Sequence, residues 1–383
     1  MQKWLAFLLI VFILFGCKKE FTPNGALGGT NKYLVVDGII NAGTDSTFIK
    51  LSTTKKFDTV IVADPVTGAK LIVESDANSS YPLIEIRPGT YAAAPLNLDA
   101  AHKYRLRIKT SDNREYLSDL VAVKNAPPID SIGFKALGDG LHIYVNSHNA
   151  ANNTRYYRWD FDETWQFHAN LFSTYTAPGK YNCFGNHVSN TINIANTAKL
   201  SSDVVYQAPI TTIPSSSEKI EVKYSILVRQ YALSGDAYNF WENLQKNSSN
   251  LGSIFDAQPS LNQTNYHNTA DPNEPVIGYL SVGSYSSKRI FISAAQLPAG
   301  YKANNGLSCP IDTAYYFHEP YYYPNPPYAS VDISGKYPGY IGLERSYITP
   351  QGPFGAPNFI TYTRTECADC TLRGNQVQPS FWK

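Results

Sequence analysis

Residues 156–168 read YYRWDFDETWQFH, a stretch in which aromatic and polar side chains alternate. Successive side chains of a β-strand point to opposite faces of its sheet, so odd and even positions can be compared directly. The odd positions, from Tyr157 to Phe167, are aromatic except for one acid, and the even positions, from Tyr156 to His168, are mostly polar. The pattern predicts a long strand with one buried face, in a fold built from β-sheets.

Three carboxylates lie in this stretch, and the alternation separates them. Asp160 and Asp162 share the polar face about 7 Å apart. They could form a solvated face paired with Arg158, half of an ion site or the acid pair of an inverting glycosidase, and we expect the solvated face. Glu163 falls on the aromatic face, where an unpaired carboxylate is costly. We expect a buried structural acid, satisfied by an arginine or by backbone amides, unless a β-bulge near Asp162 re-aims the strand.

The composition favours the same fold class in the rest of the chain. With 28 Tyr, 18 Phe, 24 Pro and one Met, the sequence is rich in residues of strands and turns. Between residues 33 and 124, short apolar runs recur at spacings of about ten residues, the pattern of an immunoglobulin-like sandwich. The run 103–110, KYRLRIKT, is predicted to bury Tyr104, Leu106 and Ile108. Paired prolines at 127–128 favour a domain boundary there.

We therefore predict a mainly β protein with two domains. Residues 32–126 form an N-terminal immunoglobulin-like β-sandwich, and residues 127–383 form a larger β-rich domain of fibronectin or immunoglobulin type. One short amphipathic helix is predicted at 235–247, because Ala237, Phe240, Trp241 and Leu244 recur at helical spacing after Ser234 as N-cap. Trp241 is expected to anchor that helix in the core.

A loop at 315–340 concentrates eight tyrosines and five prolines. Fixed proline φ angles favour a stiff loop over a disordered tail. Its rings could pack on their own domain, or they could contact a ligand or a protein partner, since tyrosine is enriched at binding hot spots. The candidate contact residues are Tyr316, Tyr321, Tyr322, Tyr323 and Tyr328.

The N-terminus has the features of an export signal. Lys3 precedes twelve apolar residues, 4–15, which as a helix cover only about 18 Å and are too short to span a bilayer. Leu14-Phe15-Gly16-Cys17 resembles the site where bacterial lipoproteins are cleaved before a lipidated cysteine, although Phe15 departs from the usual small residue. We predict a signal peptide at 1–16, lipidation of Cys17 and a lipidated tether at 17–31. Lys18, in place of an inner-membrane retention aspartate, favours the outer membrane.

Chemical motifs are few. No catalytic signature is present, the seven histidines are scattered, and loss of Lys3 leaves 31 basic against 31 acidic side chains, which argues against a nucleic-acid partner. Beyond Cys17 an even number of cysteines remains, which in an exported protein predicts two disulfides with three possible connectivities. A four-thiolate zinc site is the less favoured alternative, because only one pair is close in sequence. The four are Cys183, Cys309, Cys367 and Cys370.

Several segments resemble the domain-of-unknown-function 4249 lipoproteins. They include Leu34-Val-Val-Asp-Gly38, the run 224–234 (YSILVRQYALS), Gly252-Ser-Ile-Phe-Asp256 and Cys367-Ala-Asp-Cys370. The resemblance implies an outer-membrane lipoprotein, typically encoded beside a TonB-dependent transporter. It brings no catalytic residues with it.

The resulting hypothesis is a non-enzymatic outer-membrane lipoprotein. Acyl chains on Cys17 would hold it in the lipid bilayer at the cell surface, where it would act as accessory or ligand-capture partner of a TonB-dependent barrel. The alternatives are an adhesin or scaffold, and a surface hydrolase using Asp160, Asp162 or Glu163. We expect no cofactor, no metal site and no catalytic residue.

Overall fold

The computed structural model describes residues 33–54, 64–174, 179–249, 264–315, 338–346 and 359–383. Strands dominate this part of the chain, which confirms the predicted mainly β fold class. The predicted signal peptide, Cys17 and the tether lie outside the described residues. So do the candidate contact residues of the tyrosine-rich loop, Tyr316, Tyr321, Tyr322, Tyr323 and Tyr328.

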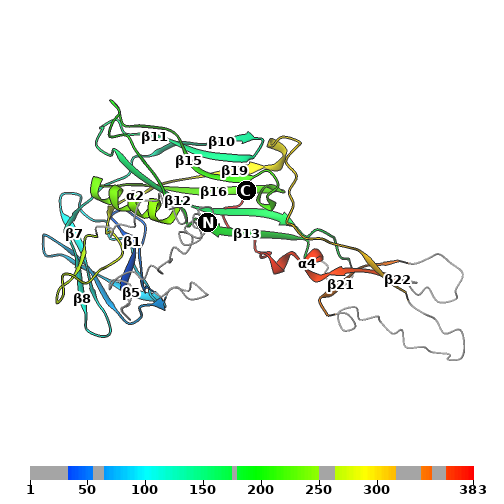
Figure 1. Cartoon of the computed structure of the whole chain (residues 1–383), viewed down its shortest axis with the longest axis horizontal. Helices are drawn as coiled ribbons and strands as arrows, with labels where there is room; N and C mark the ends of the chain where they lie inside the picture. The colour runs from blue at the N-terminus through cyan, green and yellow to red at the C-terminus, as the bar shows by residue number, and fades with distance from the viewer. Residues whose placement is uncertain (1–32, 55–63, 175–178, 250–263, 316–337, 347–358) are drawn as a thin grey trace, which may run out of the picture.

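Residues 33–126 supply most of the first unit, a curled β-sandwich around one core (Figure 1). Its strands are β1 (Leu34–Asn41), β2 (Thr47–Thr53), β3 (Asp64–Pro65), β4 (Lys70–Ser75), β5 (Ser80–Arg87), β6 (Thr90–Ala93), β7 (Lys103–Lys109), β8 (Glu115–Ser118) and β9 (Val121–Ala122). The hydrogen-bonded order is β8-β7-β4-β5-β6-β2-β1, since β5 pairs with both β4 and β6. Along β7, Tyr104, Leu106 and Ile108 are buried, as the alternation predicts.

The chain later returns to this first unit. β17 (Tyr266–Asn268) pairs with β8, and β18 (Val282–Gly283) runs parallel to β1. The return requires glycine at 283, because a Cβ there would lie 1.7 Å from the carbonyl oxygen of Lys124. A division of the chain at residue 126 therefore omits a segment that completes the first sandwich. Strands of two or three residues carry too little alternation to be recognised from sequence.

The second unit is a sandwich of two sheets. One sheet has the order β10-β11-β15, and the other has the order β13-β12-β16-β19, with β14 also paired to β12. Inward residues of both sheets form one core, in which Tyr157, Trp159 and Phe161 of β12 are buried. The strands are β10 (Ile129–Leu137), β11 (Gly140–His148), β12 (Tyr156–His168), β13 (Asn182–Val188), β14 (Asn193–Asn196), β15 (Val204–Pro214), β16 (Lys223–Ala232) and β19 (Ser286–Ser293).

The predicted helix is present as α2 (Gly235–Ser249). Ser234 caps it, since its side-chain oxygen accepts the backbone N–H of Ala237 at 3.1 Å. Ala237 and Phe240 are buried, whereas Trp241 is only half-buried. The guanidinium carbon of Arg158 lies 4.0 Å from the ring centroid of Trp241. Among the helices of the described residues, none is long and apolar enough to cross a membrane.

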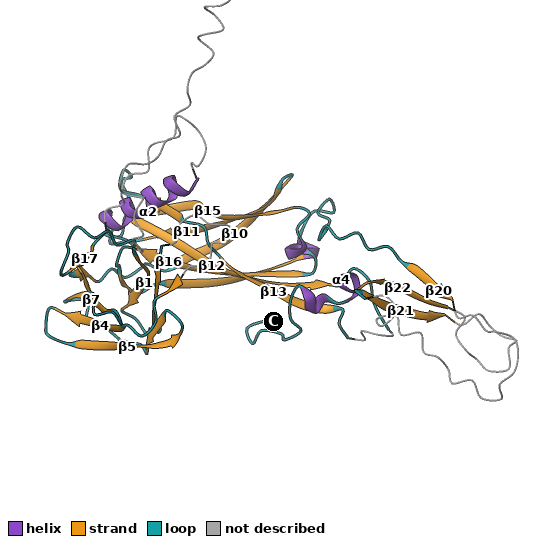
Figure 2. Ribbon diagram, turned by 60° about the horizontal axis from the view of Figure 1, so that its bottom comes forward, coloured by secondary structure: helices purple, strands orange, loops and turns teal. Residues whose placement is uncertain are grey.

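A fourth sheet forms an arm that projects from the second unit (Figures 1 and 2). It has the order β20-β22-β21, with strands β20 (Asp312–Tyr315), β22 (Phe359–Arg364) and β21 (Tyr340–Ser346). Short helices α4 (Thr365–Ala368) and η3 (Cys370–Leu372) follow β22, while η1 (Glu218–Ile220) and η2 (Ala294–Gln296) flank β16 and β19.

Two disulfides fasten the end of the chain. Cys183 of β13 bonds Cys370, and Cys309 bonds Cys367. The two predicted disulfides are thus present, with the connectivity that the sequence left open. Since Cys367 and Cys370 lie just after β22, Cys183–Cys370 ties the segment after the arm to the second unit, and Cys309–Cys367 ties it to the residues just before β20.

Candidate functional site

The strand β12 carries its acids on two faces of its sheet. Its pairings with β13 and β16 run in continuous register, so the bulge considered near Asp162 is absent. Asp160 and Asp162 therefore lie on the outer face, away from the β10-β11-β15 sheet, and Glu163 lies on the inner face with Trp159 and Phe161.

One arginine pairs with both outer acids. Arg229 of β16 lies directly opposite Asp160 in the register. Its Nε donates to Asp160 Oδ1 at 2.7 Å, and its Nη1 and Nη2 each donate to one oxygen of Asp162 at 2.7 Å. Burial alone would lower the pKa of Arg229, but its hydrogen bonds and the charges of Asp162 and Asp160 raise it. The expected partner, Arg158, lies instead on Trp241.

Glu163 is satisfied by three side chains of the inner face. Its side chain is 2% exposed. Oε2 accepts from Lys219 Nζ at 2.5 Å and lies 2.8 Å from His187 Nδ1, while Oε1 accepts from the hydroxyl of Tyr224 at 2.7 Å. The prediction that a buried arginine or backbone amides would satisfy Glu163 is therefore wrong. Burial and the charge of Glu163 raise the pKa of Tyr224, which keeps that hydroxyl a donor.

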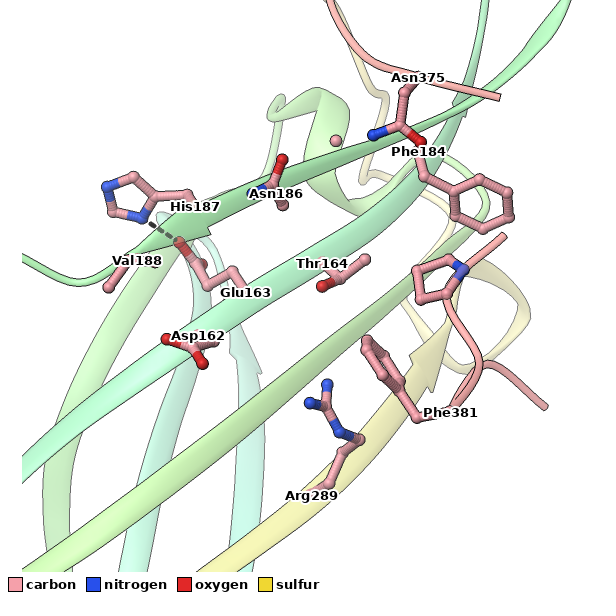
Figure 3. Close-up of a pocket in the computed structure, with 12 residues that line it drawn as sticks. Asp162, Glu163, Thr164, Phe184, Asn186, His187, Val188, Arg289, Asn375 and Phe381 are labelled. Atoms are coloured by element: carbon pink, nitrogen blue, oxygen red, sulfur yellow. Dashed lines mark hydrogen bonds and ion pairs between the residues drawn. The ribbon is translucent and has the colours of Figure 1, made fainter. Parts of the chain in front are cut away.

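A pocket of about 360 Å³ opens on the outer face beside these acids (Figure 3). Its floor comes from β12, β13 and β19, whose register brings Val188, Asp162 and Arg289 into one row across the sheet. Residues 370–383, here called the C-terminal segment, form its opposite wall. The lining residues are Asp162, Glu163, Thr164, Phe184, Gly185, Asn186, His187, Val188, Arg289, Asn375, Pro379 and Phe381.

The C-terminal segment is held against the sheet at several points. Asn375 exchanges backbone hydrogen bonds with Phe184 in both directions, at 2.7 and 3.0 Å. The chains approach so closely that a Cβ on Gly374 would lie 2.5 Å from the carbonyl oxygen of Phe184. The ring of Trp382 meets Phe184 edge-on, with centroids 5.2 Å apart, and meets Phe291 in the same way at 5.6 Å. Together with the Cys183–Cys370 disulfide, these contacts make the wall part of the fold.

Arg289 is the pocket's cation without an acid partner. Its guanidinium carbon lies 3.6 Å from the ring centroid of Phe381, and Nη1 donates to Ser225 Oγ at 3.0 Å. In the part of the chain that the structure describes, no carboxylate forms an ion pair with it. Burial lowers the pKa of Arg289, against the opposing charge of Asp162. Figure 3 shows Arg289 and Phe381 adjacent, with Asn186 beyond Thr164 and Val188 beyond Asp162.

The sequence pointed to the acids of this site and not to its cation. Arg289 sits in the run SSKRIFIS, where nothing distinguishes it from an ordinary exposed strand residue. None of the motifs described above pointed to Phe381 as a residue of this site. Within the described residues, no group of three or more His, Cys, Asp and Glu side chains is arranged to hold a metal ion.

Comparison with known proteins gives a family and distant structural likenesses. A family model described as "Domain of unknown function (DUF4249)" matches residues 18–289. A segment of two fibronectin type-III domains from chicken tenascin is 11% identical, with 53% of this chain and 93% of that chain covered and a TM-score of 0.16. The adhesin InvE of Yersinia pseudotuberculosis is 14% identical, with 54% and 56% covered and a TM-score of 0.15. Among curated proteins, no sequence matches.

Proposed function

The chain belongs to the DUF4249 family, a domain of unknown function, and from that premise we propose that it is a non-enzymatic binding lipoprotein of the outer membrane. In this proposal it captures a ligand in the pocket and acts with a TonB-dependent barrel. The observation that carries the binding role is that both acids lining the pocket are already paired, Asp162 with Arg229 and Glu163 with Lys219.

Paired acids are poorly placed for hydrolysis. An acid pair that cleaves a glycosidic bond needs one carboxyl group to donate a proton and the other to act on water or the sugar. Both oxygens of Asp162 are held by one guanidinium, and Glu163 is buried among three donors. Neither carboxylate has a free oxygen directed at a ligand, so the site favours recognition over hydrolysis.

The chemistry of the chain also supports export. Two disulfides occur in the described residues, and disulfides persist in oxidising compartments such as the periplasm and cell surface. The Leu14-Phe15-Gly16-Cys17 motif supplies a lipid anchor for the same route. More than one acyl chain on Cys17 would hold the protein stably on a membrane.

A second candidate is an adhesin or scaffold. The observation that favours it is the arm formed by β20, β21 and β22, which projects from the second unit and offers a surface separate from the pocket (Figure 2). In that case the arm would carry the contacts with a partner, and the pocket would be dispensable for binding it.

The proposal is tested by purifying the full chain from outer membranes of its native host under mild detergent. We expect a TonB-dependent barrel to co-purify in a fixed ratio. A C17S variant, which lacks the lipid attachment site, is the control for capture after solubilisation. Recovery of the lipidated protein alone would contradict the partnership with a barrel.

A further inference from the structure

We propose that the pocket between β12, β13, β19 and the C-terminal segment binds a small organic carboxylate through Arg289. The inference rests on the proposed function, because it assigns a ligand class to the same binding site.

One cation of the pocket, Arg289, has no ion pair within the described residues. Arg229 is shared between Asp160 and Asp162, so these three groups keep one negative charge, and Glu163 is matched by Lys219. Arg289 adds a further positive charge that no carboxylate of the described residues pairs. A partly buried charge is attracted to an anion more strongly than an exposed one, because water screens it less. Arg289 is therefore the group of the pocket at which an anion would bind.

The geometry of Arg289 suits a planar anion. Its contact with Phe381 at 3.6 Å and its hydrogen bond to Ser225 hold the guanidinium in one orientation. The Ser225 bond uses Nη1, so the remaining N–H groups stay available to a ligand. A guanidinium fork matches the two oxygens of a carboxylate in a bidentate pair. Since the pocket has a single unpaired guanidinium, a singly charged carboxylate fits it better than a more highly charged anion.

The other lining residues indicate the chemistry of the ligand beyond its carboxylate. Phe184, Val188, Pro379 and Phe381 offer apolar surface, and the amide groups of Asn186 and Asn375 can donate and accept hydrogen bonds. The volume of about 360 Å³ is near the lower end of ligand pockets, which run from about 300 to 1,000 Å³. A sugar acid or the carboxyl end of a short peptide has this size and chemistry.

The experiment compares each acid with its uncharged counterpart on the full lipidated chain in detergent micelles. The probes are N-acetyl-phenylalanine against its amide, and D-glucuronate against D-glucose, titrated by calorimetry. We expect at least one acid to bind about tenfold or more tightly than its counterpart, because a charge-assisted hydrogen bond is lost with the charge. The pair that shows the difference identifies a peptide or a sugar source.

Variants test whether Arg289 causes the preference for the acid over its uncharged counterpart. We expect R289Q to abolish the preference for the acid, and R289K to retain only part of it because a lysine lacks the fork. K50Q, which removes an exposed cation of β2, is the control with the same change in net charge and should bind as the wild type does. Circular dichroism shows whether each variant is folded. The comparison of each acid with its uncharged counterpart is made on the wild type, so it does not depend on the folding of any variant.

Three outcomes would overturn the inference: equal affinity for acid and counterpart in both pairs, no binding of either acid at millimolar concentration, or an undiminished preference in folded R289Q. These outcomes are distinct from failure of the proposed function. A chain that co-purifies with a barrel yet shows no acid preference refutes the ligand class alone. A chain that prefers the acid through Arg289 yet is recovered without a barrel refutes the partnership alone.

Discussion

Lys219 donates to Glu163 at 2.5 Å across the inner face of the second sandwich, where the carboxylate is 2% exposed and the lysine side chain 28% exposed. The pair joins η1 to β12, and Tyr224 and His187 complete the shell around the acid. Because Glu163 binds side chains from η1, β13 and β16, it holds these elements against β12. Its expected role is therefore structural.

Replacing Glu163 with glutamine tests that role. The E163Q variant keeps the size of the side chain but leaves Lys219 without its anion, so we expect the free energy of unfolding to fall by about 2 kcal/mol. E242Q is the matched control, because Glu242 pairs with Lys246 on the exposed face of α2, and such pairs contribute about 0.5 kcal/mol or less. Urea unfolding followed by circular dichroism measures both. Wild-type stability in E163Q would contradict a structural role for this acid.

The docking of β18 on the first unit depends on a close backbone approach. A Cβ at position 283 would lie 1.7 Å from the carbonyl oxygen of Lys124, so G283A must move β18 away from Lys124. We expect a loss of about 1–3 kcal/mol, the usual cost of forced overpacking. G138A is the control, since a Cβ there meets nothing within 4 Å. Thermal unfolding of the two variants is the measurement, and equal melting temperatures would argue against this close approach.

The two disulfides should differ in what they contribute to stability. Cys183–Cys370 closes a loop with a sequence separation of 187, against 58 for Cys309–Cys367. In the chain-entropy treatment, the longer loop contributes about 1 kcal/mol more. We therefore expect C183A/C370A to lose more stability than C309A/C367A in urea unfolding. The reverse order would show that native contacts, and not loop closure, set their contributions.

Asp203 makes stability depend on pH. Burial raises the pKa of its carboxyl, but hydrogen bonds from Thr197, Tyr157 and the backbone N–H groups of Arg155 and Thr154 outweigh burial and lower it. A lowered pKa in the folded state stabilises the fold above the unfolded pKa near 4, and this contribution is lost as the pH falls through the folded pKa.

The D203N variant isolates that contribution. It should be less stable than the wild type at pH 7, and the difference should shrink as the pH falls from about 5 to about 3. Urea unfolding across this range gives the difference directly. A difference that stays constant with pH would mean that Asp203 contributes through its shape and not through its charge.

Alternation within single strands allowed the sequence to predict part of this structure. The two faces of β12 and the buried side of β7 follow from residue parity alone, as does the burial of Glu163. The helix α2 follows from its apolar spacing. These features depend on neighbours in the chain, and a single sequence contains that information.

The partners of these residues come from far along the chain, and they were not predictable. Lys219 and Tyr224 lie 56 and 61 residues after Glu163, and Arg229 lies 69 residues after Asp160. Arg289 and Phe381 meet only because β19 and the C-terminal segment reach the same face of one sheet. Such contacts depend on strand order and register, which alternation in one strand does not determine.

The central claim is that the pocket face works beside a TonB-dependent barrel, and photo-crosslinking in intact cells of the native host tests it most directly. A photoreactive phenylalanine replaces Val188, an exposed lining residue, or Asn186 in a second variant. Lys50 on the first unit is the control position. We expect an adduct between the pocket face and a TonB-dependent barrel, stronger than from Lys50. Folded, lipidated protein with no barrel adduct from either pocket position would contradict it.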